Sequence, residues 1–230
     1  MTIESIPPSP GVGRTRLSDP SIRWLIAATL LVWVVALAEW FFAAAVINSV
    51  WILALLLWAG TGVLALSLTV VLLFVLVRRG RFLSAGGVVV AAILVSTTVL
   101  SVPWVEAYPR IWFATHRAQF ARAVDLAASG SLEPGLDEYM GAPLPADISA
   151  ISVSGTLVRI LAFDTEDGGT PSECEPALFA PAMFGIPDGA IGFVYLPCAG
   201  PPADFYLDAY ADGIVPRIEL GDGWWWADGG

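Results

Sequence analysis

The sequence holds few residues that could carry out nucleophilic or acid–base catalysis. His116 is the only histidine, and a Ser–His–Asp or Cys–His mechanism would have to use it. The chain has no G-x-S-x-G nucleophile motif. One histidine and two cysteines are also too few for the usual zinc sites unless carboxylates complete them. We therefore predict a surface or capping role for His116, with no metal and no cofactor.

Carboxylates between positions 164 and 188 are the remaining candidates for chemistry. The loop at 164–175 lacks the D-x-D-x-D-G spacing of a calcium loop, so we expect a solvated acidic loop there. Paired carboxylates also hydrolyse glycosidic bonds. A carboxylate-dependent envelope hydrolase is therefore an alternative function, with its acids drawn from Asp164, Glu166, Asp167 and Asp188.

The two cysteines, Cys174 and Cys198, both lie in the C-terminal half of the chain. An even pair confined to one half favours a disulfide in an oxidising, extracytoplasmic compartment. The alternative is a pair of buried free thiols.

Three consecutive tryptophans, Trp224, Trp225 and Trp226, are the most unusual local feature of the sequence. In a strand, the first and third face one way and the second faces the other. If one face is core, the opposite face exposes an indole that could bind a glycan, a peptide or a partner protein. The three tryptophans are therefore a candidate binding surface. The alternative is that a helix covers one face and a loop or the membrane surface covers the other.

These residues belong to a chain with two unlike halves. The 230 residues are 57% apolar, above the ~45–50% of soluble domains, and residues 24–105 hold most of the excess. Because runs of about 20 apolar residues cross a bilayer, we predict three transmembrane helices, at about 23–47, 50–77 and 82–102, in a membrane region at 23–105. The proline-rich residues 1–22 are predicted to be a disordered cytoplasmic tail.

Arginine determines the predicted orientation in the plasma membrane. The chain has no lysine, and six arginines flank the first span or lie between the second and third: Arg14, Arg16, Arg23, Arg78, Arg79 and Arg81. The positive-inside rule places both groups, and so the N-terminus, in the cytoplasm. Three spans then place the C-terminal domain on the extracytoplasmic side. A cleaved signal peptide at the first span is the alternative, and it leaves that domain on the same side.

Two features of the spans are candidates for polar or packing contacts. Glu39 is the only acid within a span, and such an acid can couple ions or contact a partner helix. We favour a third interpretation, in which Glu39 lies shallow enough to reach the headgroups. Small residues at 60–62 and 86–87 permit close approach of helices, and we expect them to pack within this bundle rather than against an oligomeric partner.

Residues 106–230 form an acidic domain with 18 acids and 5 arginines, a balance that excludes nucleic-acid binding through phosphates. An amphipathic helix is predicted at 111–129. Strands are predicted at 148–154, 156–163, 190–196, 214–220 and 224–227, with hairpin turns at 154–155 and 221–223. The fold class is therefore an α-helical membrane bundle followed by a small α+β domain, in which a helix packs on an antiparallel sheet of four or five strands.

Three segments of the C-terminal half carry a resemblance: HRAQFARAV at 116–124, FGIPDGAIGFVYLP at 184–197 and LGDGWWW at 220–226. They resemble uncharacterised multi-pass membrane proteins of high-GC, actinobacterial-type bacteria that carry a C-terminal extracytoplasmic domain. The resemblance covers roughly residues 110–228 and implies no activity, but it agrees with a location in the cell envelope.

These features favour a membrane-anchored extracytoplasmic binding or accessory module of the cell envelope over an enzyme. Its partners would be the lipid bilayer and either another membrane protein or an envelope glycan. Besides the hydrolase, the alternative is a small accessory subunit of a larger membrane complex, held through Glu39 and the glycine faces.

Overall fold

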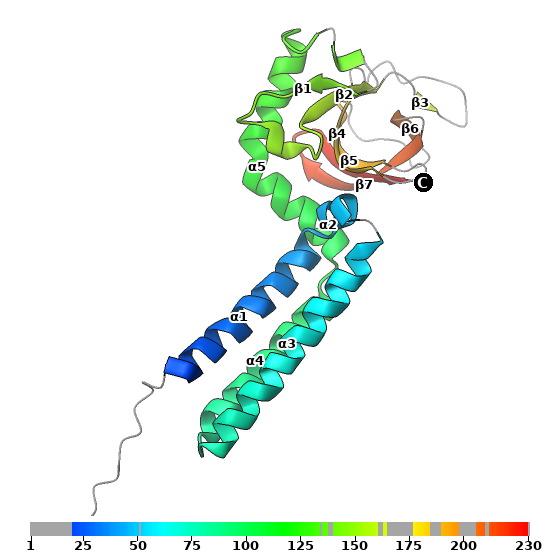
Figure 1. The fold of residues 1–230 in the computed structure, drawn as a ribbon. Coiled ribbons are helices and arrows are strands. Elements are labelled where there is room, and N and C mark those ends of the chain that lie inside the picture. The colour runs from blue at the N-terminus through cyan, green and yellow to red at the C-terminus, as the bar shows by residue number, and fades with distance from the viewer. Residues whose placement is uncertain are drawn as a thin grey trace, which may run out of the picture.

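The protein consists of a bundle of three long helices with a helix-and-sheet domain at one end (Figure 1). A computed structural model describes residues 20–50, 52–133, 135–137, 140–160, 163–164, 177–184, 190–197, 206–209 and 212–229. Its α-helices are α1 Pro20–Phe41, α2 Ala43–Val50, α3 Leu53–Arg78, α4 Phe82–Ser101 and α5 Trp104–Ala128. Nearly all of the tail predicted at 1–22 lies outside the described residues.

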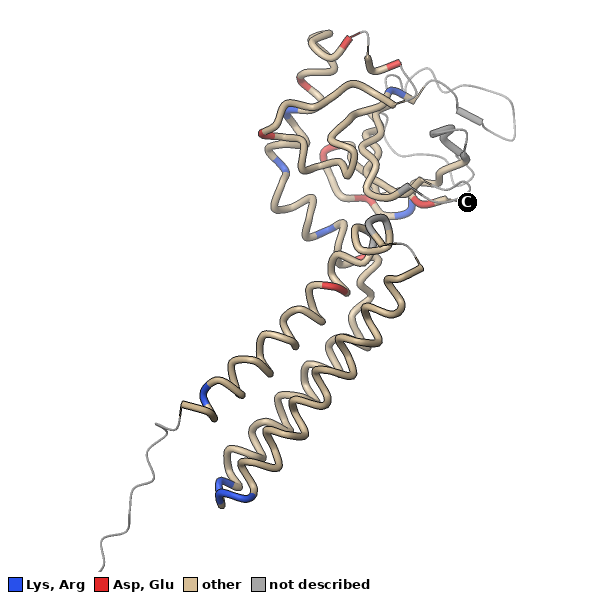
Figure 2. Tube along the Cα trace, in the orientation of Figure 1, with Lys and Arg blue, Asp and Glu red and all other residues tan. Residues whose placement is uncertain are grey.

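Helices α1, α3 and α4 are each long and apolar enough to cross a membrane. Their sides are apolar but mostly uncovered by protein, as Leu83 and Leu100 show with 96% and 85% of their surface exposed. So much apolar surface suits the hydrocarbon core of a bilayer. Helix α3 lies between α1 and α4 and packs on both. Figure 2 shows basic residues gathered at the end of the bundle away from the domain, in the α3–α4 turn and near the start of α1.

The three predicted spans are confirmed, with one correction at the end of the first. Helix α1 ends at Phe41, and a turn at Phe42 separates it from α2, so the helix predicted at 23–47 is broken. The short helix α2 packs against strand β4 of the C-terminal domain. This tertiary contact is the physical reason for the break, because a continuous helix would carry those residues away from the sheet.

Helix α5 confirms the amphipathic helix predicted at 111–129 but begins earlier, at Trp104. It contains Pro109 in its second turn, where the proline removes the helical hydrogen bond to the Val105 carbonyl. A kink lies at His116, where φ is −114° and ψ is 15°. The side chains of His116 and Thr115 both reach the carbonyl of Trp112, at 2.9 and 3.0 Å, and so compete with the helical hydrogen bond to it. Gly130, with φ +72°, follows the helix end.

The described strands form one antiparallel sheet in the order β1-β2-β4-β5-β8-β7-β6-β3. Their bounds are β1 Ala142–Pro143, β2 Thr156–Ile160, β3 Phe163–Asp164, β4 Ala177–Phe184, β5 Ala190–Tyr195, β6 Tyr206–Ala209, β7 Asp212–Gly221 and β8 Trp224–Gly229. The α+β class is confirmed, but the sheet is larger than the four or five strands predicted, since six of these strands have four residues or more.

Two segments account for most of the difference between the predicted sheet and the observed sheet. Strand β4 was not predicted because Pro181 lies in its middle, and the structure accommodates the proline at a register shift between Pro181 and Met183. The strand predicted at 148–154 is wrong, because Ser149–Ile151 is a 3-10 turn. A second 3-10 turn is formed by Gly135–Asp137.

The hairpin predicted at the C-terminus is confirmed as β7 and β8. Its turn residues, Gly221, Asp222 and Gly223, all have positive φ, at +105°, +54° and +80°. Arg117 of α5 donates two hydrogen bonds to the Asp222 carboxylate, at 2.5 and 2.6 Å. These bonds lower the pKa of Asp222, so that the pair keeps its charges at neutral pH and loses this contact only in acid.

The sheet buries both of its faces. One face packs on α5 around Phe120, Phe193 and Trp224, which are at most 1% exposed. The other face carries a second core that includes Phe179 and Val194. Strands β2 and β6 touch although four strands separate them in the sheet order, so the sheet curls around this second core.

Candidate functional site

The three consecutive tryptophans do not form an exposed binding surface. Trp224 and Trp226 are 1% and 4% exposed and belong to the core between the sheet and α5. Trp225 points to the opposite face, where it is half-buried against the second core. The alternation predicted for the strand is correct. The alternative in which a helix covers one face is also correct for Trp224 and Trp226, because α5 packs on them, so these two residues are not a binding surface.

Several candidate residues lie outside the described part of the chain. They are both cysteines, Cys174 and Cys198, and the acids Glu166, Asp167 and Asp188 of the hydrolase alternative. The side chain of Asp164 is likewise not described, although its backbone pairs with β6. Among the described residues, no three His, Cys, Asp or Glu side chains gather closely enough to hold a metal ion.

His116 is half-buried in the middle of α5 rather than at a helix end. Its ring stacks on Trp112 at 4.0 Å between centroids, and Nδ1 lies 2.9 Å from the Trp112 carbonyl oxygen. It also lies 3.0 Å from Thr115 Oγ1. The histidine therefore helps to shape the kink of α5.

Glu39 lies near the end of α1 and is turned into the bundle. It is 9% exposed, and its carboxylate accepts a hydrogen bond of 2.9 Å from the Thr61 hydroxyl of α3. The adjacent Trp40 stacks on Trp58 of α3, with ring centroids 5.3 Å apart. The acid therefore ties α1 to α3, and its depth relative to the headgroups stays a prediction.

A single substitution tests this contact. Replacing Thr61 with valine removes the donor but keeps the shape, and we expect a loss of about 0.6–1.7 kcal/mol in bundle stability. Unfolding of the protein in mixed detergent and SDS micelles measures the change. The matched control is Thr98→Val, because the Thr98 hydroxyl is exposed and bonds only within its own helix, to the Leu94 carbonyl. Equal stability of the two variants would contradict the role assigned to the Glu39–Thr61 bond.

The glycines of the spans do not pack within the bundle as predicted. A Cβ atom added at Gly60, Gly62, Gly86 or Gly87 would meet no heavy atom within 4 Å. These four positions therefore face away from the neighbouring helices. Helix α4 contacts α3 through other residues, such as Ala85.

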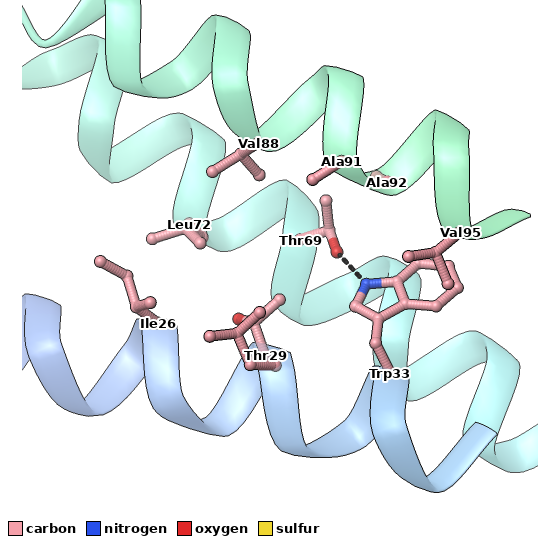
Figure 3. Close-up of a pocket in the computed structure, with 10 residues that line it drawn as sticks. Ile26, Thr29, Trp33, Thr69, Leu72, Val88, Ala91, Ala92 and Val95 are labelled. Carbon is pink, nitrogen blue, oxygen red and sulfur yellow. Dashed lines mark hydrogen bonds between the residues drawn. The ribbon is translucent and has the colours of Figure 1, made fainter. Parts of the chain in front are cut away.

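A narrow cavity of about 110 Å³ opens between α1, α3 and α4, inside the membrane-spanning part (Figure 3). Figure 3 shows Trp33 of α1 reaching toward α3, where its indole N–H donates a hydrogen bond of 3.1 Å to the Thr69 hydroxyl. Thr69 in turn donates to the Ala65 carbonyl. Since these polar atoms satisfy one another, the cavity offers a ligand an almost wholly apolar wall.

A second cavity lies where the bundle meets the domain, and an aromatic cluster builds it. Tyr108, in the second turn of α5, is the centre of this cluster. Its ring centroid lies 5.5 Å from that of Phe41 in α1, 5.8 Å from that of Trp112 and 5.9 Å from that of Trp226 in β8. Tyr108 thereby touches the end of a span and the sheet at once.

This junction cavity has a volume of about 220 Å³. Its walls come from four separate parts of the chain, and they include Phe41, Ala43, Val105, Met183, Ile191 and Trp226. Sequence reasoning missed this set, because only the helix spacing of Tyr108 and Trp112, just after the third span, could have pointed to it. The residues share no motif and come together only when α2 docks on β4.

The ionisable groups in the cavity wall are few and neutralised. Burial raises the pKa of Tyr108 from its ordinary value of 10.0 to about 12, and the phenol is protonated at physiological pH at either value. Asp228 pairs with Arg217, with 3.0 Å between Oδ1 and Nε. Such a wall suits apolar groups, and among the described residues it holds no unpaired acid beside a base of the kind that general acid–base catalysis needs.

Two of the sites sought in the sequence, Glu39 and the tryptophans, have structural roles. The junction cavity, which was not sought there, is the candidate functional site.

Comparison with known proteins found no protein-family model, no curated protein and no solved structure that matches the chain.

Proposed function

We propose that this protein is a membrane-anchored binding module of the cell envelope, with its C-terminal domain on the extracytoplasmic side. The observation that carries the proposal is the junction cavity, whose walls are contributed jointly by the membrane helices and the sheet. A domain that was only tethered would not need its sheet to close a cavity with the ends of the spans. The architecture supports binding at the bilayer surface.

Charge supports the proposed orientation. Arginines cluster at the end of the bundle away from the domain, as the positive-inside rule requires of a cytoplasmic end. From residue 106 onward the chain carries 18 acids and 5 arginines. In the extracytoplasmic compartment Cys174 and Cys198 can form the proposed disulfide.

The character of the cavity supports binding rather than catalysis. Its wall is apolar and aromatic, Tyr108 is held neutral, and Asp228 is occupied by Arg217. Ligand pockets are lined mainly by apolar and aromatic side chains with a few polar groups, whereas catalysis adds reactive groups with matched pKa values.

Cysteine labelling in intact cells tests the orientation. In a variant whose two native cysteines are replaced by serine, Val153→Cys places a thiol on an exposed turn of the domain. We expect a membrane-impermeant maleimide to label it in intact cells, whereas Ser9→Cys should be labelled only after permeabilisation. The reverse pattern would overturn the proposal.

The same reagent tests the disulfide in the unaltered protein. We expect Cys174 and Cys198 to react only after reduction. Labelling without reduction would leave the orientation standing and remove the disulfide.

A further inference from the structure

Part of the wall of the junction cavity is exposed at the end of the bundle. Val105, in its wall, is 70% exposed, and Trp40, also in its wall, is 37% exposed. One turn before Val105, at the end of α4, Leu100 is 85% exposed. The cavity wall therefore includes apolar side chains that are themselves exposed at the end of the bundle.

The size and the chemistry of the cavity narrow the class of ligand. About 220 Å³ is below the roughly 300–1,000 Å³ of pockets that hold drug-sized molecules, so the cavity suits a slender chain. A glycan needs hydrogen-bonding partners for its hydroxyls, and this wall offers few, since Asp228 is already bonded to Arg217. An unbranched hydrocarbon needs none.

Resting on the proposed function, we infer that the junction cavity binds the acyl chain of a phospholipid from the leaflet that borders the domain. The chain enters beside Val105 and lies between the Phe41–Ala43 segment and the sheet residues Met183 and Ile191. Water would otherwise meet this apolar wall, and burying hydrocarbon against it releases that water. The headgroup stays outside the cavity.

Photo-crosslinking tests the inference on the full-length protein. The protein is reconstituted in phosphatidylcholine vesicles that contain a trace of phosphatidylcholine with a diazirine on one acyl chain. After illumination, mass spectrometry maps the adducts. We expect adducts on the sheet residues Met183 or Ile191 in addition to those on lipid-facing span residues such as Leu83. Adducts confined to the spans would overturn the inference.

Substitutions that fill the cavity with a larger side chain provide a second test of the inference. Ala43→Phe adds a ring from the α2 side without altering the sheet, and we expect sheet adducts to fall about tenfold, which corresponds to ~1.4 kcal/mol of lost affinity. Ile191→Trp fills the same space from the sheet side and should have the same effect. Span adducts on Leu83 serve as the internal standard. Met140→Phe, at a residue that is 60% exposed and is not part of the cavity wall, is the control and should change nothing. Sheet adducts that persist at the original level in both filled variants would overturn the inference.

The outcome is separable from that of the orientation test. Sheet adducts together with a domain labelled only in permeabilised cells would uphold the lipid site and overturn the proposed side of the membrane. An externally labelled domain without sheet adducts would overturn the lipid site and leave the orientation standing.

Discussion

Replacing Phe120 with alanine is expected to lower the free energy of unfolding of the C-terminal domain by about 3–5 kcal/mol. Phe120 is 0% exposed, and its ring centroid lies 4.8 Å from Trp224 and 4.9 Å from Phe193. A third ring, Phe113, lies 5.1 Å away on the same helix. The side chain thus joins α5 to β5 and β8, and its loss removes buried area and leaves a cavity between two rigid layers.

Hydrogen exchange of sheet peptides measures this loss, because the slowest amides in a core strand report the opening of the whole domain. The matched control is Phe74→Ala, the same chemical change at a residue of α3 that is 56% exposed and lies outside the domain. We expect the control to leave exchange in β5 and β8 unchanged. Equal exchange in the two variants would mean that α5 does not stabilise the sheet.

The spans could be predicted from sequence because a run of about 20 apolar residues has essentially one stable form in lipid, the helix. Helix α4, found at Phe82–Ser101, matches its prediction at 82–102 to within a residue. The end of α1 could not be predicted in this way. Its break at Phe42 depends on a contact between α2 and β4, a strand far along the chain.

Proline limited the prediction of the domain. The run ALFAPAMF at 177–184 reads poorly as an interior strand, because proline cannot donate a ladder hydrogen bond. The structure resolves this with a register shift next to Pro181. Pro109 similarly hid the first two turns of α5, and with them Tyr108.

The functional site was the least predictable part. Alternation along β8 correctly separates Trp225 from Trp224 and Trp226, but burial depends on which element covers each face. The tryptophans were candidates because they are unusual in sequence. The junction cavity consists of ordinary apolar residues, and its chemistry arises from their convergence rather than from any spacing.

Replacing Tyr108 with alanine is expected to loosen the attachment of the domain to the spans while leaving the sheet folded. Tyr108 contacts Phe41 and Phe42 on the membrane side, and Phe193 and Trp226 on the sheet side. Truncation of a fully buried aromatic side chain costs about 3–5 kcal/mol. Tyr108 is half-buried, so we expect a smaller cost, most of which falls on the interface between the two parts.

Spin-label distance measurements in nanodiscs detect this change. Labels at Leu53→Cys in α3 and Val153→Cys in the domain, both exposed residues, report the position of the sheet relative to the bundle once the native cysteines are replaced by serine. We expect one narrow distance distribution for the parent and a broad one for Tyr108→Ala. Hydrogen exchange in β5 should stay slow, which separates loosening from unfolding.

The Tyr108→Phe variant shows whether the ring or the hydroxyl of Tyr108 holds the domain against the spans. It keeps every aromatic contact of the junction and removes only the phenol oxygen, so its distance distribution should match that of the parent. If the junction holds the acyl-chain site together, Tyr108→Ala should also reduce lipid adducts on Met183, and Tyr108→Phe should not. A narrow distance distribution in Tyr108→Ala would contradict this prediction. It would show that the packing of α2 on the sheet holds the domain in place without the aromatic contacts of Tyr108.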